Sequence, residues 1–239
     1  MKNFFKKIIV TLLTWEAKAV LRKYKPKIVA VTGSVGKTST KDAIFAVLSK
    51  KFHVRKSQKS FNSEFGLPLT ILGAPNAWNN PLRWIQILID GVILLVTNAT
   101  YPEWLVLEVG ADRPGDISGL RSWLTTDVVV ITYIPDVPVH VEFFDSPEAV
   151  ALEKASLIDT LKPEGSLILN GDDPRTKALA HRLPAPDAKL FTYGFGQYND
   201  IHAEDPVLVR QEGGEVWPVG MRAKLVVLGE SVEVEMLGA

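Results

Sequence analysis

The stretch "KIVAVTGSVGKTST", residues 27–40, joins a short apolar run to a helical pattern through a turn that contains two glycines. Ile28–Thr32 is interpreted as a buried strand, because it is apolar, short and bounded by turn residues. A helix is expected from about Thr38. Between the two elements, Gly33 and Gly36 let the backbone wrap around an anion that the amides at the helix start would face. The stretch therefore predicts a P-loop.

The loop matches the short pattern G-x-x-G-K-[ST], because Val31 stands where the longer pattern has a further glycine. In such a loop the lysine reaches the outer phosphates and the hydroxyl of the next residue ligates magnesium. The alternative is a tight strand-to-helix turn with a threonine cap, which carries no ligand. The residues predicted to bind phosphate are Gly33, Ser34, Val35, Gly36, Lys37, Thr38 and Ser39.

Beyond the loop, short apolar runs alternate with helical patterns, which predicts an α/β fold with a mainly parallel sheet and helices on both faces. After Gly194 the pattern changes to short segments with glycine and proline, which predict a small antiparallel β segment. The expected organisation is an N-terminal helix over residues 1–24, a nucleotide-binding domain over 25–199 and the β segment over 200–239.

The N-terminal segment predicts a basic amphipathic helix. Packing on the domain and anchoring at a membrane surface remain equally open for it. The apolar run Ile8–Trp15 is shorter than the roughly 20 residues that span a bilayer. A second, nearly all-apolar helix is expected over residues 84–96, buried or interfacial. The predicted apolar face of the first helix comprises Phe4, Phe5, Ile8, Ile9, Leu12, Leu13, Ala19 and Val20.

Composition excludes several classes of protein. With 239 residues, 46% of them hydrophobic, the chain can bury a real core, so disorder is not expected. The 27 basic and 27 acidic residues balance, but 16 basic and 4 acidic residues lie in residues 1–100. This basic half can attract phosphates or an anionic membrane. No nucleic acid is expected, because no recognition helix accompanies the charge. The absence of cysteine fits the cytoplasm.

Three polar residues follow apolar runs at the positions where parallel strands are expected to end. Glu108 closes "WLVLE", His140 lies in the loop after "DVVVITYI", and Asn170 follows "SLIL". Each has an ordinary alternative: a surface strand end, a loop histidine and a polar turn. Because ligands lie at the carboxyl ends of strands in such sheets, we predict that all three gather at the P-loop.

The helix expected to begin at Ser146 has a predicted apolar stripe formed by Val150, Leu157, Ile158 and Leu161. Lys154 lies on this stripe, four residues after Val150 and three before Leu157. A lysine in this position either snorkels to the surface or is buried. A buried ammonium group beside magnesium would be repelled, so such a lysine should be neutral or chemically altered.

Five motifs in order, "VTGSVGKTST", "FNSEFGLPLTIL", "LEVGADRPGDI", "VHVEFFDSPEAVALEKASLI" and "LILNGDDPR", resemble the central ATPase domain of the Mur ligases over roughly residues 25–200. They look most like the branch that adds D-Ala-D-Ala to a UDP-muramoyl tripeptide. The resemblance implies a cytoplasmic ATP-dependent amide ligase of peptidoglycan precursor synthesis, which activates a carboxylate as an acyl phosphate for attack by an amine.

The resemblance also implies roles for individual residues. Lys37 and Thr38 match the P-loop pair, and Glu108 and His140 match ligands of two magnesium ions. Lys154 matches the lysine that CO₂ often carbamylates, which makes it a further metal ligand. Asn170 matches an asparagine on the adenine side of ATP, and Asn62 lies in a loop that borders the substrate in this branch.

Three departures from the family pattern carry further expectations. The basic helix stands in place of a UDP-sugar domain, residues 84–96 lengthen a connection, and the sequence stops at "EMLGA" before a usual "G-x-H-N" stretch. We expect a fragment or truncated relative that is inactive alone. The alternative function is a membrane-surface nucleotide-binding or scaffold protein without ligase activity. Peripheral contact with the anionic inner face of the membrane is expected through residues 1–25.

Overall fold

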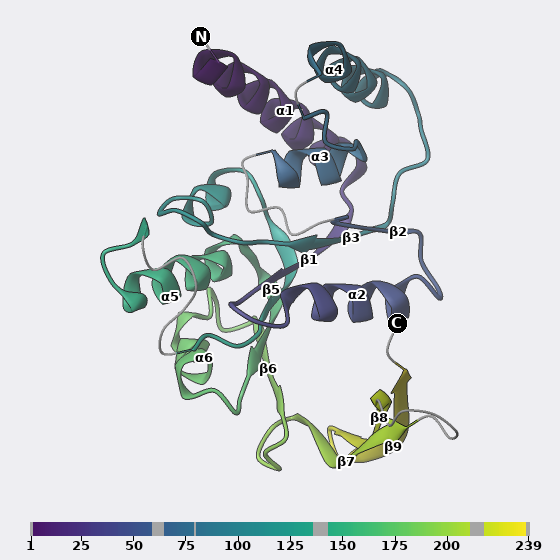
Figure 1. The fold of residues 1–239 in the computed structure, drawn as a ribbon, viewed down its shortest axis with the longest axis vertical. Coiled ribbons are helices and arrows are strands. Elements are labelled where there is room, and N and C mark those ends of the chain that lie inside the picture. The colour runs from purple at the N-terminus through teal and green to yellow at the C-terminus, as the bar shows by residue number, and fades with distance from the viewer. Residues whose placement is uncertain (1, 59–64, 79, 136–142, 211–217, 238–239) are drawn as a thin grey trace.

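The computed structural model describes residues 2–58, 65–78, 80–135, 143–210 and 218–237. Within these ranges nine strands form one sheet in the order β2-β3-β1-β4-β5-β6-β7-β8-β9 (Figure 1). The strands are β1 (Lys27–Thr32), β2 (Val54–Lys56), β3 (Trp104–Glu108), β4 (Thr126–Ile131), β5 (Leu161–Asn170), β6 (Lys189–Gly194), β7 (Ile201–Arg210), β8 (Pro218–Val227) and β9 (Glu230–Leu237).

The strands pair in parallel from β2 through β7, and β7, β8 and β9 pair antiparallel. Both parts of the predicted fold class are thus confirmed. The antiparallel part continues the same sheet, because the start of β7 pairs with the end of β6 through Tyr193 and Gly194. In Figure 1 the antiparallel strands lie beyond β6, at the end of the molecule opposite α1 (Lys2–Tyr24) and α4 (Pro81–Val96).

Helices cover both faces of the parallel strands, as the alternating sequence pattern predicts. Figure 1 shows α2 on one face and α1 with α3 on the other. The faces hold separate apolar clusters: Val29 and Val31 point to one, while Ile28 and Ala30 point to the other. The helices are α1 (Lys2–Tyr24), α2 (Lys37–Leu48), α3 (Gly66–Leu72), α4 (Pro81–Val96), α5 (Pro147–Ala155) and α6 (Pro174–Ala178), with 3₁₀ turns η1 (Ser118–Ser122), η3 (Ser156–Thr160) and η4 (Leu179–Arg182).

The helix that carries Lys154 begins as predicted and ends earlier. The Ser146 hydroxyl accepts a hydrogen bond from the Ala149 amide, and Pro147 occupies the first turn of α5. The α-helix stops at Ala155, and the 3₁₀ turn η3 follows it. Leu161, predicted to belong to the apolar stripe of this helix, instead begins β5. The early end brings the chain into the sheet after one short turn.

The N-terminal helix α1 packs on the domain through Leu13, Ala17 and Val20, which are fully buried in the main core. Two residues of the predicted apolar face, Ile8 and Leu12, are exposed. The side chains of Phe4 and Phe5, which were also assigned to that face, are not among those that the structure describes. The helix is apolar around so much of its circumference that sequence spacing alone did not fix its buried side.

Glu16 lies at the contact between α1 and α4 and is almost completely buried. Its carboxylate sits against Gly91 of α4, where an added Cβ would lie 2.2 Å from Oε2. Burial raises the pKa of Glu16 to about 7. Gly91 therefore leaves the room that this side chain needs between the two helices.

The apolar segment predicted at residues 84–96 forms α4, which starts three residues earlier. Asn80 caps the helix by accepting a hydrogen bond from the Arg83 amide, and Pro81 follows it. One side is buried through Trp84, Ile87 and Gly91. No helix in the described part of the chain is long and apolar enough to cross a membrane.

Candidate functional site

The predicted P-loop forms the turn from β1 into α2. Gly33 and Gly36 both have positive φ, 143° and 84°, which side chains rarely allow. Gly36 is the residue before the first turn of α2, and its side-chain-free backbone leaves the helix start open to solvent. The first amides of a helix have no intrahelical acceptor and carry partial positive charge. The loop therefore offers backbone donors to an anion.

The two residues that follow β4, Thr132 and Tyr133, form hydrogen bonds with this loop. The Thr132 hydroxyl donates to the Val35 carbonyl at 2.7 Å, and the Ser34 amide donates to the Tyr133 carbonyl at 2.8 Å. A Cβ on Gly33 would lie 1.9 Å from the Thr132 hydroxyl oxygen. Glycine is thus required at position 33 by space as well as by φ, and β4 fixes the shape of the loop.

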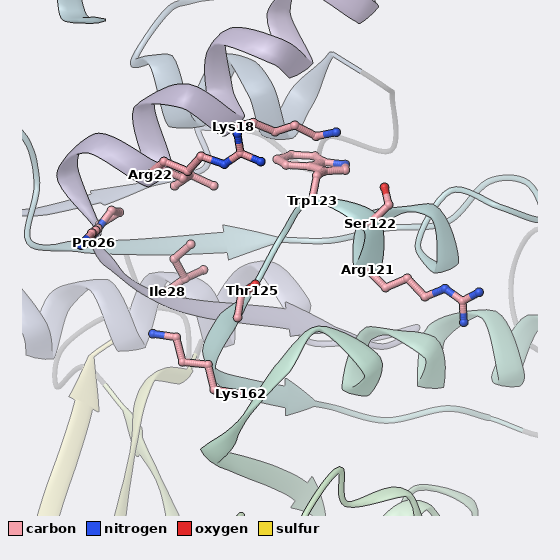
Figure 2. A pocket seen from close by; sticks show the side chains of 11 residues that line it. Lys18, Arg22, Pro26, Ile28, Arg121, Ser122, Trp123, Thr125 and Lys162 are labelled. Atoms are coloured by element: carbon pink, nitrogen blue, oxygen red, sulfur yellow. The ribbon is translucent and has the colours of Figure 1, made fainter.

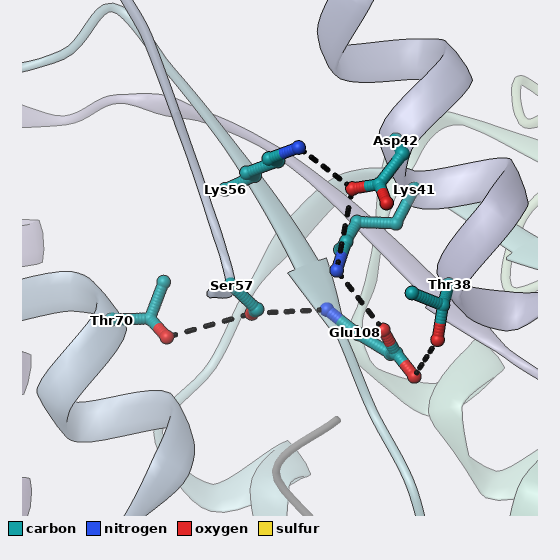
Figure 3. A network of polar contacts seen from close by, with 7 residues as sticks. All are labelled: Thr38, Lys41, Asp42, Lys56, Ser57, Thr70 and Glu108. Atoms are coloured by element: carbon teal, nitrogen blue, oxygen red, sulfur yellow. Dashed lines mark hydrogen bonds and ion pairs between the residues drawn. The ribbon is translucent and has the colours of Figure 1, made fainter. Parts of the chain in front are cut away.

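Glu108, at the end of β3, is buried next to the start of α2 (Figure 3). The Thr38 hydroxyl donates to Glu108 Oε1 at 2.9 Å, and the Lys41 ammonium lies 3.3 Å from Oε2. The Ser57 hydroxyl accepts from the Glu108 amide at 3.2 Å. A carboxylate oxygen and a hydroxyl oxygen, ligands suited to Mg²⁺, are therefore adjacent beside the phosphate loop.

Lys41 is the buried cation that balances Glu108. Its side chain is only 2% exposed, and its ammonium also lies 3.4 Å from the Asp42 carboxylate. Asp42 in turn accepts from Lys56 of β2 at 2.8 Å, and this contact is the main cause of its lowered pKa. A buried carboxylate without such a partner would be costly. The network ties α2 to the end of β3.

Lys154 points into the protein. Its side chain is 2% exposed, and its ammonium donates to the Gly33 carbonyl at 3.2 Å. The alternative of a snorkelling surface lysine is wrong. Burial lowers the pKa of Lys154 to about 8, and the positive charge of Lys37 contributes to this shift, while Asp112 opposes it. The Lys154 ammonium group thus contacts the backbone of the P-loop, and its pKa is lower than that of an exposed lysine.

Lys37 and Asp112 complete the described charges around the loop. The Lys37 ammonium donates back to the Ser34 carbonyl at 3.2 Å, and burial lowers its pKa against the attraction of Glu108 and Asp112. The loop that carries Asp112 is held in place by α5, because Glu153 accepts hydrogen bonds from the Ile117 and Ser118 amides. Adjacent residues of α5 therefore fix this loop and contact the P-loop.

Asn170 ends β5, two strands away from the P-loop strand, and its side chain accepts from the Asp172 amide at 3.0 Å. The Asp172 carboxylate accepts from the Phe195 and Gly196 amides and from the Asn199 side chain at 2.8 Å. Asn170 thus belongs to a turn that fixes the segment after β6. Among the described residues, no hydrogen bond or ion pair joins Asn170 to the P-loop.

Two predicted site residues, Asn62 and His140, lie outside the described residues, so their predicted roles stay predictions. Within the described ranges no cluster of three or more histidine, aspartate or glutamate side chains is placed to hold a metal ion.

Three residues at the site were missed by sequence reasoning: Lys41, Asp112 and Thr132. Lys41 follows Thr38 by three residues, so both share a face of α2, and this spacing was a usable signal. Asp112 lies in the quoted motif "GADRPGDI". Thr132 carries no comparable signal, because its role depends on how β4 meets the loop.

A glycine-containing loop that joins the carboxyl end of a parallel strand to the start of a helix is the defining feature of a P-loop domain. Residues 31–82 and 90–237 match the Mur ligase middle domain, and the chain belongs to the Mur ligase family.

Relatives with described functions share this sequence over part of their length. UDP-N-acetylmuramoyl-tripeptide–D-alanyl-D-alanine ligase of Bacillus subtilis (strain 168) is 34% identical over 196 residues, covering 82% of this chain and 36% of that protein. The ligase of the same name from Mycobacterium leprae (strain TN) is 33% identical over 172 residues, covering 72% and 28%. The chain therefore spans about a third of the length of these relatives.

Solved structures agree with the family. MurF ligase from Thermotoga maritima in complex with ADP superposes with a TM-score of 0.71 at 26% identity, over 96% of this chain and 44% of that one. MurF from Acinetobacter baumannii gives a TM-score of 0.70 at 19% identity, over 97% and 42%, which supports the fold alone. The relatives named here are ligases and give no support to a scaffold role.

Proposed function

We propose that this chain is the ATP-binding core of a Mur-type amide ligase that acts in peptidoglycan precursor synthesis. The observation that carries the proposal is the meeting of Thr38, Glu108 and Lys154 at one phosphate loop. Two of these side chains are buried and charged, and they come from β3 and α5, elements far apart in the sequence. Charges buried at a loop of this kind suit a polyphosphate and its metal ion.

The residues present fit ATP with Mg²⁺. The loop from Gly33 to Ser39 contains two glycines with the positive φ that a phosphate cradle would use, and the Ser34 hydroxyl is buried with no hydrogen-bond partner among the described residues. Lys37 would hold the outer phosphates. The Thr38 hydroxyl and the Glu108 carboxylate, 2.9 Å apart, would hold one magnesium ion. Magnesium supplies charge neutralisation when bound.

Lys154 would carry a carbamate in the active enzyme. The neutral amine would attack the carbon of CO₂, a C–N bond would form as one C=O π bond opens onto oxygen, and the nitrogen would release a proton. The side chain would then end in an anionic carbamate whose oxygens can act as ligands. A pKa of about 8 places a usable fraction of neutral amine near neutral pH. Together with His140, this carbamate would hold the second magnesium ion of the site.

The reaction would run in two displacements. A substrate carboxylate oxygen attacks the γ-phosphorus of ATP, the bond to the leaving ADP oxygen breaks, and an acyl phosphate forms. The nitrogen of an amine then attacks the acyl carbon and phosphate leaves. The nitrogen loses a proton, which gives the amide. The chain's own contribution is to align the phosphates and neutralise charge, which is most of what phosphoryl transfer requires.

The relatives suggest the substrates. Their names specify a UDP-N-acetylmuramoyl tripeptide and D-alanyl-D-alanine, and we propose the same acid and amine for the whole protein. Asn170 would lie on the adenine side of ATP and Asn62 beside the muramoyl substrate. The availability of ATP favours action in the cytoplasm.

The test is an assay of the whole protein to which this chain belongs. Incubated with ATP, Mg²⁺ and UDP-N-acetylmuramoyl tripeptide, it is expected to release phosphate only when D-alanyl-D-alanine or another accepted amine is added. Mass spectrometry should then detect the extended peptide. Phosphate release without an amide product, or no turnover with any muramoyl peptide, would reject the proposed function.

A further inference from the structure

The outer face of α4 is an exposed apolar surface. Its six large aliphatic side chains are between 46% and 78% exposed, and they make up more than a third of the 16 residues of this helix. Exposed apolar patches of this extent mark interaction sites in soluble proteins. These side chains, called here the α4 face, are Leu82, Ile85, Ile89, Val92, Ile93 and Val96.

We propose that the α4 face and the exposed side of α1 together dock onto an anionic lipid bilayer. Figure 1 shows α1 and α4 next to each other at one end of the molecule, away from the antiparallel strands. On α1, the exposed side chains Ile8, Leu12 and Trp15 follow the three- and four-residue spacing of a single stripe. Each of the two helices thus carries an exposed apolar stripe at this end of the molecule.

The positive charge of α1 and α4 favours an anionic surface as the binding partner. The sequences of α1 and α4 contain seven basic residues, six of them on α1, and only two acidic residues, Glu16 and Asp90. Glu16 is buried between the helices, so it does not oppose an approaching anion. Apolar residues flanked by lysine and arginine are typical of helices that lie in a membrane interface.

A cationic pocket continues the exposed stripe of α1. Lys18 and Arg22 follow Trp15 by three and seven residues, and both line a cavity of about 450 Å³ at the amino ends of β1, β4 and β5 (Figure 2). Arg121 and Lys162 line it from the other side. Lys162 is paired with Asp127 at 2.6 Å. Among the described residues, no carboxylate lies within ion-pair distance of Lys18, Arg22 or Arg121. A lipid phosphate would supply the missing negative charge.

A second copy of the chain is a poorer occupant than lipid. A symmetric contact through α4 would place two strongly basic α1 helices close together, and like charges disfavour this arrangement. Trp15, 60% exposed, is the type of side chain that is enriched where membranes meet water. With 16 residues, α4 is about 24 Å long, shorter than the hydrocarbon core, so it would lie in the plane of the surface.

The test is flotation of the purified 239-residue chain with vesicles of phosphatidylcholine alone or of equal parts phosphatidylcholine and phosphatidylglycerol. Binding is expected only to the second kind, and it should weaken as salt is raised. Ile85→Ser/Ile89→Ser should reduce binding at least tenfold, because it removes apolar area. Lys18→Gln/Arg22→Gln should reduce it about fivefold per charge removed.

The matched control is Val47→Ser/Leu152→Ser, which changes two aliphatic residues on α2 and α5 that are even more exposed than Ile85 and Ile89. It should bind vesicles like the unchanged chain, and thermal melting checks that every variant is folded. Equal flotation with both vesicle types, or binding that survives Ile85→Ser/Ile89→Ser, would overturn the proposal. A dimer that this variant dissociates, with no vesicle binding, would assign the face to a second copy.

Vesicle binding through α1 and α4 would not depend on ligase activity. Lys37→Ala, which alters the phosphate loop at the carboxyl end of β1, should leave vesicle binding unchanged. Failure of the vesicle experiment would therefore leave the proposed function untouched, and failure of the ligase assay would leave the docking surface untouched.

Discussion

Lys154→Ala in the whole enzyme is expected to lower amide-forming turnover by about a hundredfold or more while ATP affinity changes little. The carbamate proposed on Lys154 would hold the second metal ion and act mainly in the transition state. ATP affinity would depend on Lys37 and the loop amides, which this variant retains. Steady-state turnover and direct nucleotide binding measure the two effects separately.

Chemical rescue distinguishes a lost ligand from a disturbed loop. Acetate or formate should restore part of the activity of Lys154→Ala by occupying the vacated position, and the exposed control Lys50→Ala should need no rescue. Dependence of the unchanged enzyme on bicarbonate should weaken as pH rises through about 8, because more of the amine is then neutral. Full activity of Lys154→Ala without any additive would exclude the carbamate.

The second large effect is expected at Glu108. Glu108→Gln should lower turnover about a hundredfold or more, because it removes the carboxylate beside Thr38 that would bind magnesium. It should also destabilise the fold, since the Lys41 ammonium, 3.3 Å from Glu108 Oε2, would remain buried with less compensation. Thermal unfolding and turnover at graded magnesium concentrations measure these two losses.

A paired variant separates the metal role from the structural one. Glu108→Gln/Lys41→Gln removes both buried charges, so it should recover much of the stability that Glu108→Gln loses. Its turnover should stay as low as that of the single variant. Recovery of turnover together with stability would show that Glu108 acts only as the partner of Lys41.

The phosphate loop was predictable because its information is local. Gly33 and Gly36 both adopt the positive φ that their side-chain-free backbone permits, and strand and helix flank them within one residue of the expected positions. Glu108 was also predictable in position, because a polar residue closing an apolar run marks the end of a buried strand. Its partner Lys41 was not identified, because that contact requires the distance between α2 and β3.

Lys154 shows the limit of sequence periodicity. Its place on an apolar stripe predicted that it points inward, and the structure confirms this burial. The acceptor, the Gly33 carbonyl, lies 121 residues earlier and depends on how α5 packs. On α1 periodicity is less informative: Ile8 and Leu12 share the predicted apolar face with Leu13, but only Leu13 is buried by neighbouring elements.

Calorimetric titration of Mg²⁺–ATP into the 239-residue chain and into its Lys37→Ala variant tests directly whether the loop from Gly33 to Ser39 holds the phosphates of ATP. We expect saturable, magnesium-dependent binding of one nucleotide to the unchanged chain and affinity at least about a hundredfold weaker for Lys37→Ala. Equal affinity in the two proteins, or no binding to the unchanged chain, would show that the loop does not hold these phosphates.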